Sequence, residues 1–262
     1  MKKPLLDIVF FSEKRKNTLL LLKDGAREME TILRSLNTTR QALLPQIKIM
    51  EDSNLVIHKG RDAYELTILG KMLVDRMNPL LDTLTVLDKD VNFWGEHNLS
   101  FIPPHLFKRL RELTPCNVIT NIPSTGIYEP DESIVEKARN SKVQTSVTTF
   151  LYPNFASILA DFNERGVKMR LIVSEELLSK IEHEMDEVRG LLNNEFHEVF
   201  VYLGEMGFMS FGTNDFCFMM RMLTKVGNYD QTYVTACNPS AIQWGKELFE
   251  HYLKQSTKVN DL

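Results

Sequence analysis

The sequence has little of what several common protein classes require. Its 262 residues include three cysteines, Cys116, Cys217 and Cys237, and no CxxC pair. An odd number of scattered cysteines indicates neither a zinc ribbon nor a disulfide framework, and it suits a reducing compartment. No apolar run reaches the roughly 18 residues that a membrane-spanning helix needs, and the first residues lack the apolar segment of a secretory signal. We therefore expect a cytoplasmic protein with no membrane partner.

The motifs of common enzyme classes are also missing. The sequence has no GxSxG, no phosphate-binding P-loop and no GxGxxG, and none of its six histidines begins the phospholipase-type pattern of His, Lys and Asp. Glu182, His183, Glu184 and His197 could be imagined as a metal cluster, but such a charged helical stretch is typical of a solvated face. The sequence thus predicts no enzyme, no cofactor and no metal site.

The charges that are present are unevenly distributed. Hydrophobic residues make up 43% of the chain and charged residues 25%, which is ordinary for a globular protein. Residues 1–62 have 12 Lys and Arg against 8 Asp and Glu, whereas residues 63–262 have 19 against 27. The basic part is a candidate for nucleic-acid binding, and the acidic part is a candidate for a protein or small-molecule partner.

The first 91 residues predict a short leading helix, three further helices, a hairpin and a long helix. Thr38 with Gln41 fits a capping box that opens the third helix, and the hairpin turn at residues 59–62 is basic. This is the order of a winged helix-turn-helix domain, in which one helix enters the major groove and the hairpin meets the DNA backbone. The predicted ranges are 4–11, 12–23, 26–36, a third helix from 38, hairpin strands 55–58 and 63–67, and a long helix from about 68 to 89.

The segment Leu36–Glu51, followed by Leu55 and Val56, resembles the recognition helix and wing of archaeal regulators related to the ArsR type. The resemblance implies double-stranded DNA as a partner and a homodimer formed through the long helix, about 68–90. The alternative that this helix packs on its own C-terminal domain stays open. The DNA-binding residues that the resemblance implies are Thr39, Arg40, Gln41 and Lys48 on the helix, and His58, Lys59 and Arg61 on the wing.

Residues 92–262 predict an α/β domain with a mixed, largely parallel sheet. Three strand-like runs alternate with helical stretches, which is typical of a parallel sheet, and four later runs without helices indicate antiparallel strands. The first strands are predicted at 117–121, 143–150 and 167–173, the helices at 131–139, 153–165 and 174–193, the later strands at 197–203, 208–213, 216–223 and 231–237, and a final helix at 241–254.

Two features of this part are candidates for ligand binding. A tract rich in Met and aromatic residues, 202–222, can line a cavity, although alternating apolar residues are more typical of a core. Polar groups near the ends of strands in an α/β sheet are the better candidates. The predicted ligand-binding residues are Thr148, Tyr152, Arg170 and Ser174, with Trp94 and His97 either joining them or supporting the linker.

Four segments of the second part, Phe93–Pro103, Tyr152–Phe155, Gly166–Val173 and Ala241–Tyr252, resemble the methanogenesis regulatory family of methanogenic archaea. The resemblance implies a transcriptional regulator in which a winged helix precedes an effector domain that responds to a small molecule or a protein. Two alternatives remain: a protein-docking adaptor, and a phosphodiesterase-like enzyme tethered by the basic part.

Overall fold

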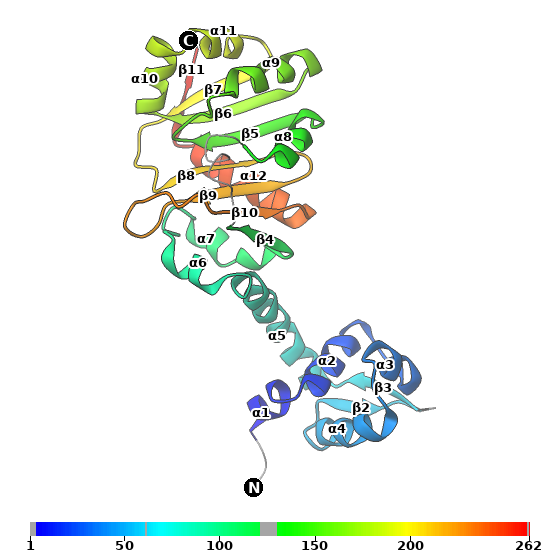
Figure 1. Cartoon of the computed structure of the whole chain (residues 1–262). Helices are drawn as coiled ribbons and strands as arrows, with labels where there is room; N and C mark the ends of the chain where they lie inside the picture. The colour runs from blue at the N-terminus through cyan, green and yellow to red at the C-terminus, as the bar shows by residue number, and fades with distance from the viewer. Residues whose placement is uncertain (1–3, 61, 121–129, 261) are drawn as a thin grey trace. The chain divides into compact units, whose positions relative to one another are not determined.

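The chain folds into two compact units, an N-terminal unit, Met1–Leu81, and a C-terminal unit, Asp82–Leu262 (Figure 1). The computed structural model describes residues 4–60, 62–120, 130–260 and 262. The division lies inside the long helix α5 (Ile68–Leu87), ten residues before the domain boundary that the sequence predicts between residues 91 and 92. Within the described ranges, no helix has the length and apolar character needed to cross a membrane.

The N-terminal unit combines short helices with a small antiparallel sheet. Its sheet has the strand order β1-β3-β2, in which β2 and β3 form the predicted hairpin. The sequence analysis missed β1, which has only two residues. The elements are α1 (Leu5–Phe10), α2 (Glu13–Leu21), η1 (Leu22–Asp24), β1 (Arg27–Glu28), α3 (Met29–Ser35), α4 (Arg40–Asp52), β2 (Val56–His58) and β3 (Ala63–Leu66).

The start of α4 differs from the prediction by one residue. Thr39, and not Thr38, is the N-cap, and its hydroxyl accepts a hydrogen bond from the Ala42 amide at 3.4 Å. The first carbonyl that accepts from the amides of α4 is that of Thr39, whereas the Thr38 amide donates back to the Leu33 carbonyl at the end of α3. The predicted capping box of Thr38 with Gln41 is therefore wrong, although the helix itself is present.

Gly70 lets α5 pack closely on the backbone of Leu55, just before β2, and on Leu66 of β3. A Cβ at this position would lie 2.1 Å from the Leu55 carbonyl oxygen and 3.2 Å from Cδ2 of Leu66. Backbone atoms cannot yield as a flexible side chain can, so we expect Gly70→Ala to lower the free energy of unfolding of the N-terminal unit by about 2–3 kcal/mol. Circular dichroism during thermal unfolding measures this loss.

Gly190→Ala is the matched control for this substitution. Gly190 lies in α11 (Asp186–Leu192), where a Cβ would meet nothing within 4 Å. Alanine is the better helix former, so this variant should gain about 0.5–1 kcal/mol. Equal stability of the two variants would refute the close approach of α5 to Leu55.

The C-terminal unit is built on an eight-stranded mixed sheet with the order β11-β7-β6-β5-β8-β9-β10-β4. The strands are β4 (Cys116–Ile119), β5 (Val143–Thr148), β6 (Lys168–Ser174), β7 (His197–Tyr202), β8 (Phe208–Thr213), β9 (Phe218–Met222), β10 (Tyr233–Ala236) and β11 (Ser256–Val259).

The sheet is mixed but not largely parallel, so that part of the prediction is wrong. Only the β5–β6 and β6–β7 pairings described are parallel. The strand expected first in the parallel series, β4, instead pairs antiparallel with β10 at the edge, and β7, expected to be antiparallel, is parallel to β6. Alternation of strands and helices along the chain does not fix the order in which strands pair. The polar strand β11 was missed because it lacks an apolar alternation.

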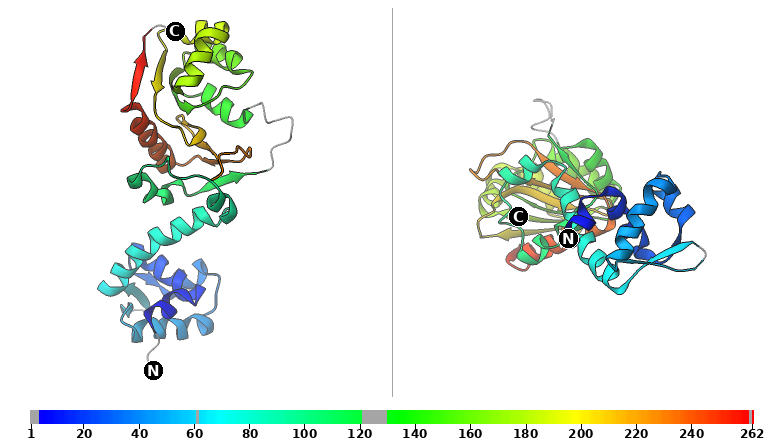
Figure 2. Two further views of the ribbon diagram at one scale, coloured as in Figure 1. Left: turned by 90° about the vertical axis from the view of Figure 1, so that its left-hand side faces the viewer. Right: turned by 90° about the horizontal axis from the view of Figure 1, so that it is seen from below.

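Helices cover both faces of this sheet (Figure 2). One face packs against α12 (Pro239–Leu253) together with α6 (Val91–Glu96), α7 (Pro104–Phe107) and η2 (Leu110–Leu113). The segment expected to be a linker at Phe93 and Trp94 is thus the helix α6, and both side chains are in the core. The other face packs against α8 (Glu132–Arg139), α9 (Phe155–Arg165), α10 (Glu175–Glu184) and α11.

Cys217 and Cys237 form a disulfide, contrary to the expectation that the cysteines stay unpaired. Their separation of 20 residues gives no disulfide signature in the sequence. The register of β9 with β10 pairs Phe218 with Ala236, which places the two cysteines next to each other at the strand ends. Lys137 Nζ lies 3.3 Å from Cys217 Sγ, and Cys116 is a buried free thiol.

Candidate functional site

The exposed face of α4 carries the residues predicted to read DNA. Leu43, Ile47 and Met50 are fully buried, so the helix is anchored along its inner side. Residues three, four and seven apart share a helix face, and Gln41, Leu44 and Lys48 follow this spacing on the outer side. Leu44, between Gln41 and Lys48 on this side, is 44% exposed. This face is one continuous surface of amide, apolar and cationic groups.

Two of the predicted cations are held by carboxylates on the hairpin. Arg40 forms an ion pair of 2.6 Å with Asp62, and Lys59 forms one of 2.7 Å with Glu65. Both pairs are solvent-exposed, so each contributes little to stability and its cation can exchange partners. Arg40 thus lies at the junction of α4 and the hairpin turn.

The other residues of this unit that are predicted to contact DNA lie at the start of α4 and on the hairpin. Thr39 is exposed at the start of α4, where its hydroxyl acts as the cap. The His58 ring is exposed on β2 and packs edge-on against Tyr64, with ring centroids 5.1 Å apart. Arg61 lies outside the described residues. In the described part of the turn, Lys59 is an exposed cation, and the Arg40–Asp62 pair joins the turn to the start of α4.

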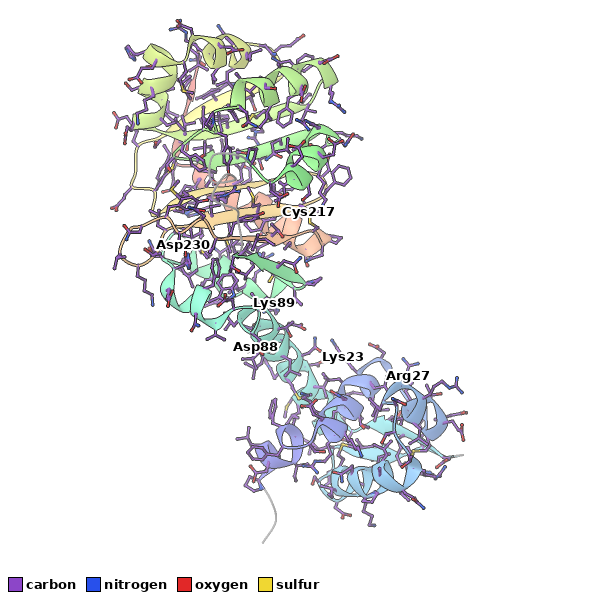
Figure 3. The ribbon with its side chains drawn as sticks, viewed as in Figure 1. Lys23, Arg27, Asp88, Lys89, Cys217 and Asp230 are labelled. Carbon is purple, nitrogen blue, oxygen red and sulfur yellow. A yellow bond between two sulfur atoms is a disulfide. The ribbon has the colours of Figure 1, made fainter. Side chains whose placement is uncertain are left out.

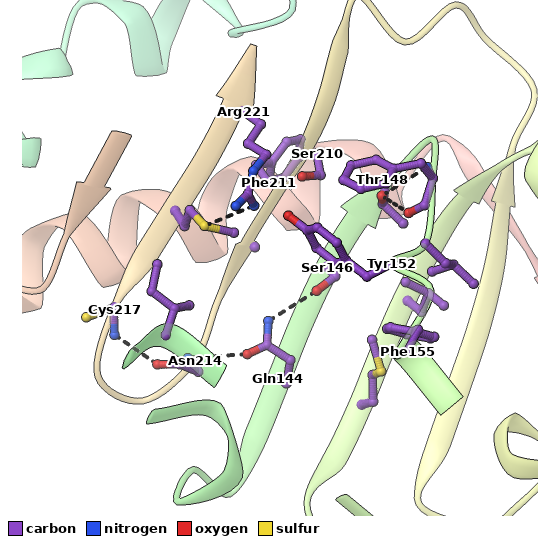
Figure 4. Close-up of a pocket in the computed structure, with 17 residues that line it drawn as sticks. Gln144, Ser146, Thr148, Tyr152, Phe155, Ser210, Phe211, Asn214, Cys217 and Arg221 are labelled. Atoms are coloured by element: carbon purple, nitrogen blue, oxygen red, sulfur yellow. Dashed lines mark hydrogen bonds between the residues drawn. The ribbon is translucent and has the colours of Figure 1, made fainter. Parts of the chain in front are cut away.

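The C-terminal unit contains a cavity of about 100 Å³ on the α8–α9 side of the sheet (Figure 4). Alternate residues of β5, Gln144, Ser146 and Thr148, line it, as the two-residue period of a strand requires. Its polar lining is one connected row, because Asn214 donates to Gln144 and Gln144 donates to Ser146 (3.3 and 3.1 Å). Its apolar lining includes Phe155, Met169, Leu171, Phe211 and Met219.

Arg221, on β9, is the charged residue of this cavity. Its side chain is 3% exposed, yet the described residues give it no carboxylate partner, and its Nε has no hydrogen-bond acceptor. One terminal nitrogen contacts Met219 Sδ at 3.3 Å, and the guanidinium lies over the rings of Tyr152 and Tyr233, 5.4 and 4.6 Å from their centroids. A buried charge without a paired carboxylate costs several kcal/mol. Such groups concentrate at functional sites.

The Tyr152 hydroxyl is a second donor without a partner at this place. It is buried and makes no hydrogen bond with the described residues, and Figure 4 shows it directed toward the guanidinium end of Arg221. Burial raises the pKa of Tyr152 to about 12, so the hydroxyl stays protonated at neutral pH and can donate. Thr148 is different, because its hydroxyl already donates to the Phe150 carbonyl at 2.6 Å.

The structure does not bring the six predicted ligand residues together. Thr148 and Tyr152 line the cavity. Arg170 points to the opposite face, where it pairs with Glu250 at 2.9 Å and lies over the Phe249 ring. Ser174 is the N-cap of α10 and accepts a hydrogen bond from the Leu177 amide.

Trp94 and His97 have structural partners in the core. The Trp94 indole donates to the Val86 carbonyl at 3.0 Å. His97 is 2% exposed, and its Nε2 lies 3.1 Å from Asp230, which is labelled in Figure 3. Hydrogen bonds from Thr232 and the contact with His97 lower the pKa of Asp230 despite its partial burial. These contacts support the loop between β9 and β10.

The sequence analysis missed Arg221, although a signal was present. It is the one cation in the apolar run Phe218–Met222, within the tract considered for a cavity. Most of that tract is core, as the alternation indicates, since Phe208, Phe218, Met220 and Met222 are fully buried. Among the described residues, no group of three or more His, Cys, Asp or Glu side chains could hold a metal ion.

Fold and site define a class of two-unit protein: a small helical unit with an exposed polar helix face, followed by a mixed α/β unit with a cationic cavity. The family models described as the N-terminal and middle domains of the methanogenesis regulatory protein FilR1 match residues 5–85 and 127–255. The chain therefore belongs to the FilR1 family and carries these two domains.

A curated relative is the methanogenesis regulatory protein FilR1 of Methanothrix harundinacea (strain 6Ac). It is 28% identical over 260 residues, which are 95% of this chain and 57% of the relative. The chain thus spans little more than half the length of that protein.

Two solved structures resemble the chain at low similarity. TrmBL2, described as an archaeal chromatin protein with a novel mode of DNA binding, has 14% identity and a TM-score of 0.44 over 97% of this chain and 98% of its own. NucT from Helicobacter pylori has 12% identity and a TM-score of 0.41 over 55% and 99%. Both TM-scores lie below 0.5, so neither similarity assigns a fold or a function.

Proposed function

We propose that the chain is a DNA-binding transcriptional regulator of a methanogenic archaeon that acts in the cytoplasm and has no catalytic activity. The observation that carries the proposal is the exposed face of α4, with Gln41, Leu44 and Lys48, next to a hairpin that presents Lys59. Membership of a family of methanogenesis regulatory proteins supports it.

In this proposal the N-terminal unit is a winged helix-turn-helix of the ArsR-like kind. α3 and α4 form the helix-turn-helix, and β2 and β3 form the wing. Gln41 matches the bidentate hydrogen-bonding edge of adenine, and Leu44 matches a thymine methyl group. Thr39 and Arg40 at the start of α4, Lys48 along it, and His58, Lys59 and Arg61 of the wing contact phosphates and adjacent bases.

The salt dependence of DNA binding tests this proposal. We expect the chain to bind duplex DNA with an affinity that falls linearly in a log–log plot against salt concentration, because bound phosphates release counterions. Lys48→Ala should reduce the magnitude of that slope by about 1, and Lys254→Ala, at an exposed end of α12, should leave it unchanged. Fluorescence anisotropy measures both slopes; identical slopes for wild type and Lys48→Ala would remove α4 from the interface.

We further propose that the regulator is a homodimer formed through α5. Several apolar side chains of this helix are exposed, among them Leu69 (51%), Met72 (60%) and Leu80 (50%). Leu80 also lines an apolar groove of about 250 Å³ between α1 and α5. Burial of such a face against a second copy is the hydrophobic gain that drives association.

Leu80→Glu should raise the dimer dissociation constant at least ~10-fold, because a carboxylate would be buried in the contact. Sedimentation velocity over a concentration series measures it. Val226→Glu, at an 81% exposed apolar residue of the C-terminal unit, is the control and should sediment as the wild type does. A wild-type chain that stays monomeric at every concentration would exclude the dimer.

The C-terminal unit is then the effector-responsive part. An effector that favours one arrangement of the dimer shifts the population toward it and changes the spacing of the two α4 helices relative to two DNA half-sites. The cavity beside Thr148 and Tyr152 offers the Tyr152 hydroxyl and the Arg221 Nε, which have no partner among the described residues, to such a molecule.

A further inference from the structure

We propose that the cavity of the C-terminal unit binds a short-chain carboxylate, with Arg221 as its counter-ion and Tyr152 as a second hydrogen-bond donor. This inference rests on the proposed role of that unit as the effector-responsive part. It goes further by naming the chemical class of the ligand.

The first step is charge. Arg221 is the fourth of the five residues of β9, an interior strand of the sheet, and is 3% exposed. Among the described lining residues of the cavity, it is the only one with a full charge at neutral pH. The described residues give its Nε no acceptor, so an anion entering the cavity meets a guanidinium that is already desolvated.

The second step is the arrangement of donors. The guanidinium lies over the Tyr152 ring, 5.4 Å from its centroid, and the Tyr152 hydroxyl is directed toward it. The Arg221 Nε and the Tyr152 hydroxyl both lack an acceptor among the described residues, and they come from β9 and from the loop after β5. A carboxylate has only acceptor oxygens and can accept from Arg221 and Tyr152 at once.

The third step is size and polarity. A cavity of about 150 Å³ holds a benzene molecule, so the 100 Å³ here accommodates about four or five non-hydrogen atoms. Phe155, Leu171 and Phe211 surround the space beyond the donors, which suits a short alkyl group. Inorganic phosphate would place polar oxygens against these side chains.

Isothermal titration calorimetry on the full chain tests the proposal with acetate and propionate, their neutral amides, and inorganic phosphate. We expect one carboxylate to bind per chain. The neutral amide of the same shape should bind at least tenfold more weakly than the carboxylate. Arg221→Gln should weaken carboxylate binding at least tenfold and reduce the preference over the amide, and Tyr152→Phe should weaken it at least threefold. Arg165→Gln, at the exposed end of α9, is the control and should bind as the wild type does.

Three results would overturn the proposal: equal affinity for carboxylate and amide, unchanged binding by Arg221→Gln, or a preference for phosphate. Absence of binding by folded wild-type chain at all concentrations would do the same. If Arg221→Gln does not fold, the Tyr152→Phe variant and the comparison of each carboxylate with its amide still test the proposal. No readout involves DNA, so a chain that binds the carboxylate without binding DNA refutes only the proposed function, and the reverse result refutes only this inference.

Discussion

The double variant Gln41→Glu with Lys48→Glu is expected to bind duplex DNA on the order of 100-fold more weakly than the wild type at about 0.1 M salt. Both positions are exposed and seven residues apart, so the two carboxylates would lie on the same face of α4 and would both repel the DNA there. The fold should be preserved, because Gln41 lies in the first turn of α4, where a negative charge is favourable. Fluorescence anisotropy of labelled duplex DNA measures the affinity, and circular dichroism checks the fold.

The control for net charge is Lys254→Glu with Gln255→Glu, which makes the same change at exposed positions of the C-terminal unit. This variant should lose less than about threefold in affinity, because its charges are not part of the proposed DNA-binding face and exposed charges are screened by salt. Equal losses in the two variants would mean that overall charge, and not the face of α4, governs DNA binding.

Trp244→Ala is expected to lower the free energy of unfolding of the C-terminal unit by about 3–5 kcal/mol. The Trp244 ring is fully buried on α12, meets Phe218 edge-on at 5.3 Å between centroids, and donates through its indole nitrogen to the Leu106 carbonyl at 3.0 Å. The substitution leaves a large cavity and removes one of the two hydrogen bonds to the Leu106 carbonyl, which also accepts from the Arg109 amide at 2.9 Å. Urea unfolding followed by the fluorescence of Trp94, the other tryptophan of the chain, reports on the same unit.

Phe216→Ala separates loss of packing from loss of an aromatic residue. Phe216 is 44% exposed in the turn between β8 and β9, so its removal should change stability by less than about 1 kcal/mol. A Trp244→Ala variant as stable as Phe216→Ala would contradict the position of Trp244 in the core.

The sequence was most informative where one residue pattern determines one local structure. The inner face of α4 follows helical spacing, and its buried residues Leu43, Ile47 and Met50 are those that the spacing predicts. The N-cap was displaced by one residue, because Thr38 and Thr39 are adjacent and chemically equivalent. The hydrogen bond from the Thr38 amide to the Leu33 carbonyl places Thr38 at the end of α3, so that Thr39 begins α4.

The sequence did not predict which strands pair or which side of the sheet each side chain faces. Helices cover both faces of the sheet, so the core strands are apolar on both sides and their alternation does not show which side holds a cavity. Arg170 and Arg221 therefore look alike in the sequence. The fold places Arg170 among carboxylates on the α12 side and leaves Arg221 unpaired on the other side.

Selection of genomic fragments by the purified chain at low and at physiological salt is the sharpest test of DNA binding. We expect particular promoter fragments to be enriched, and their affinity to fall steeply as salt rises. Failure of the folded chain to bind any fragment at low salt would contradict this expectation and would favour a protein-docking adaptor.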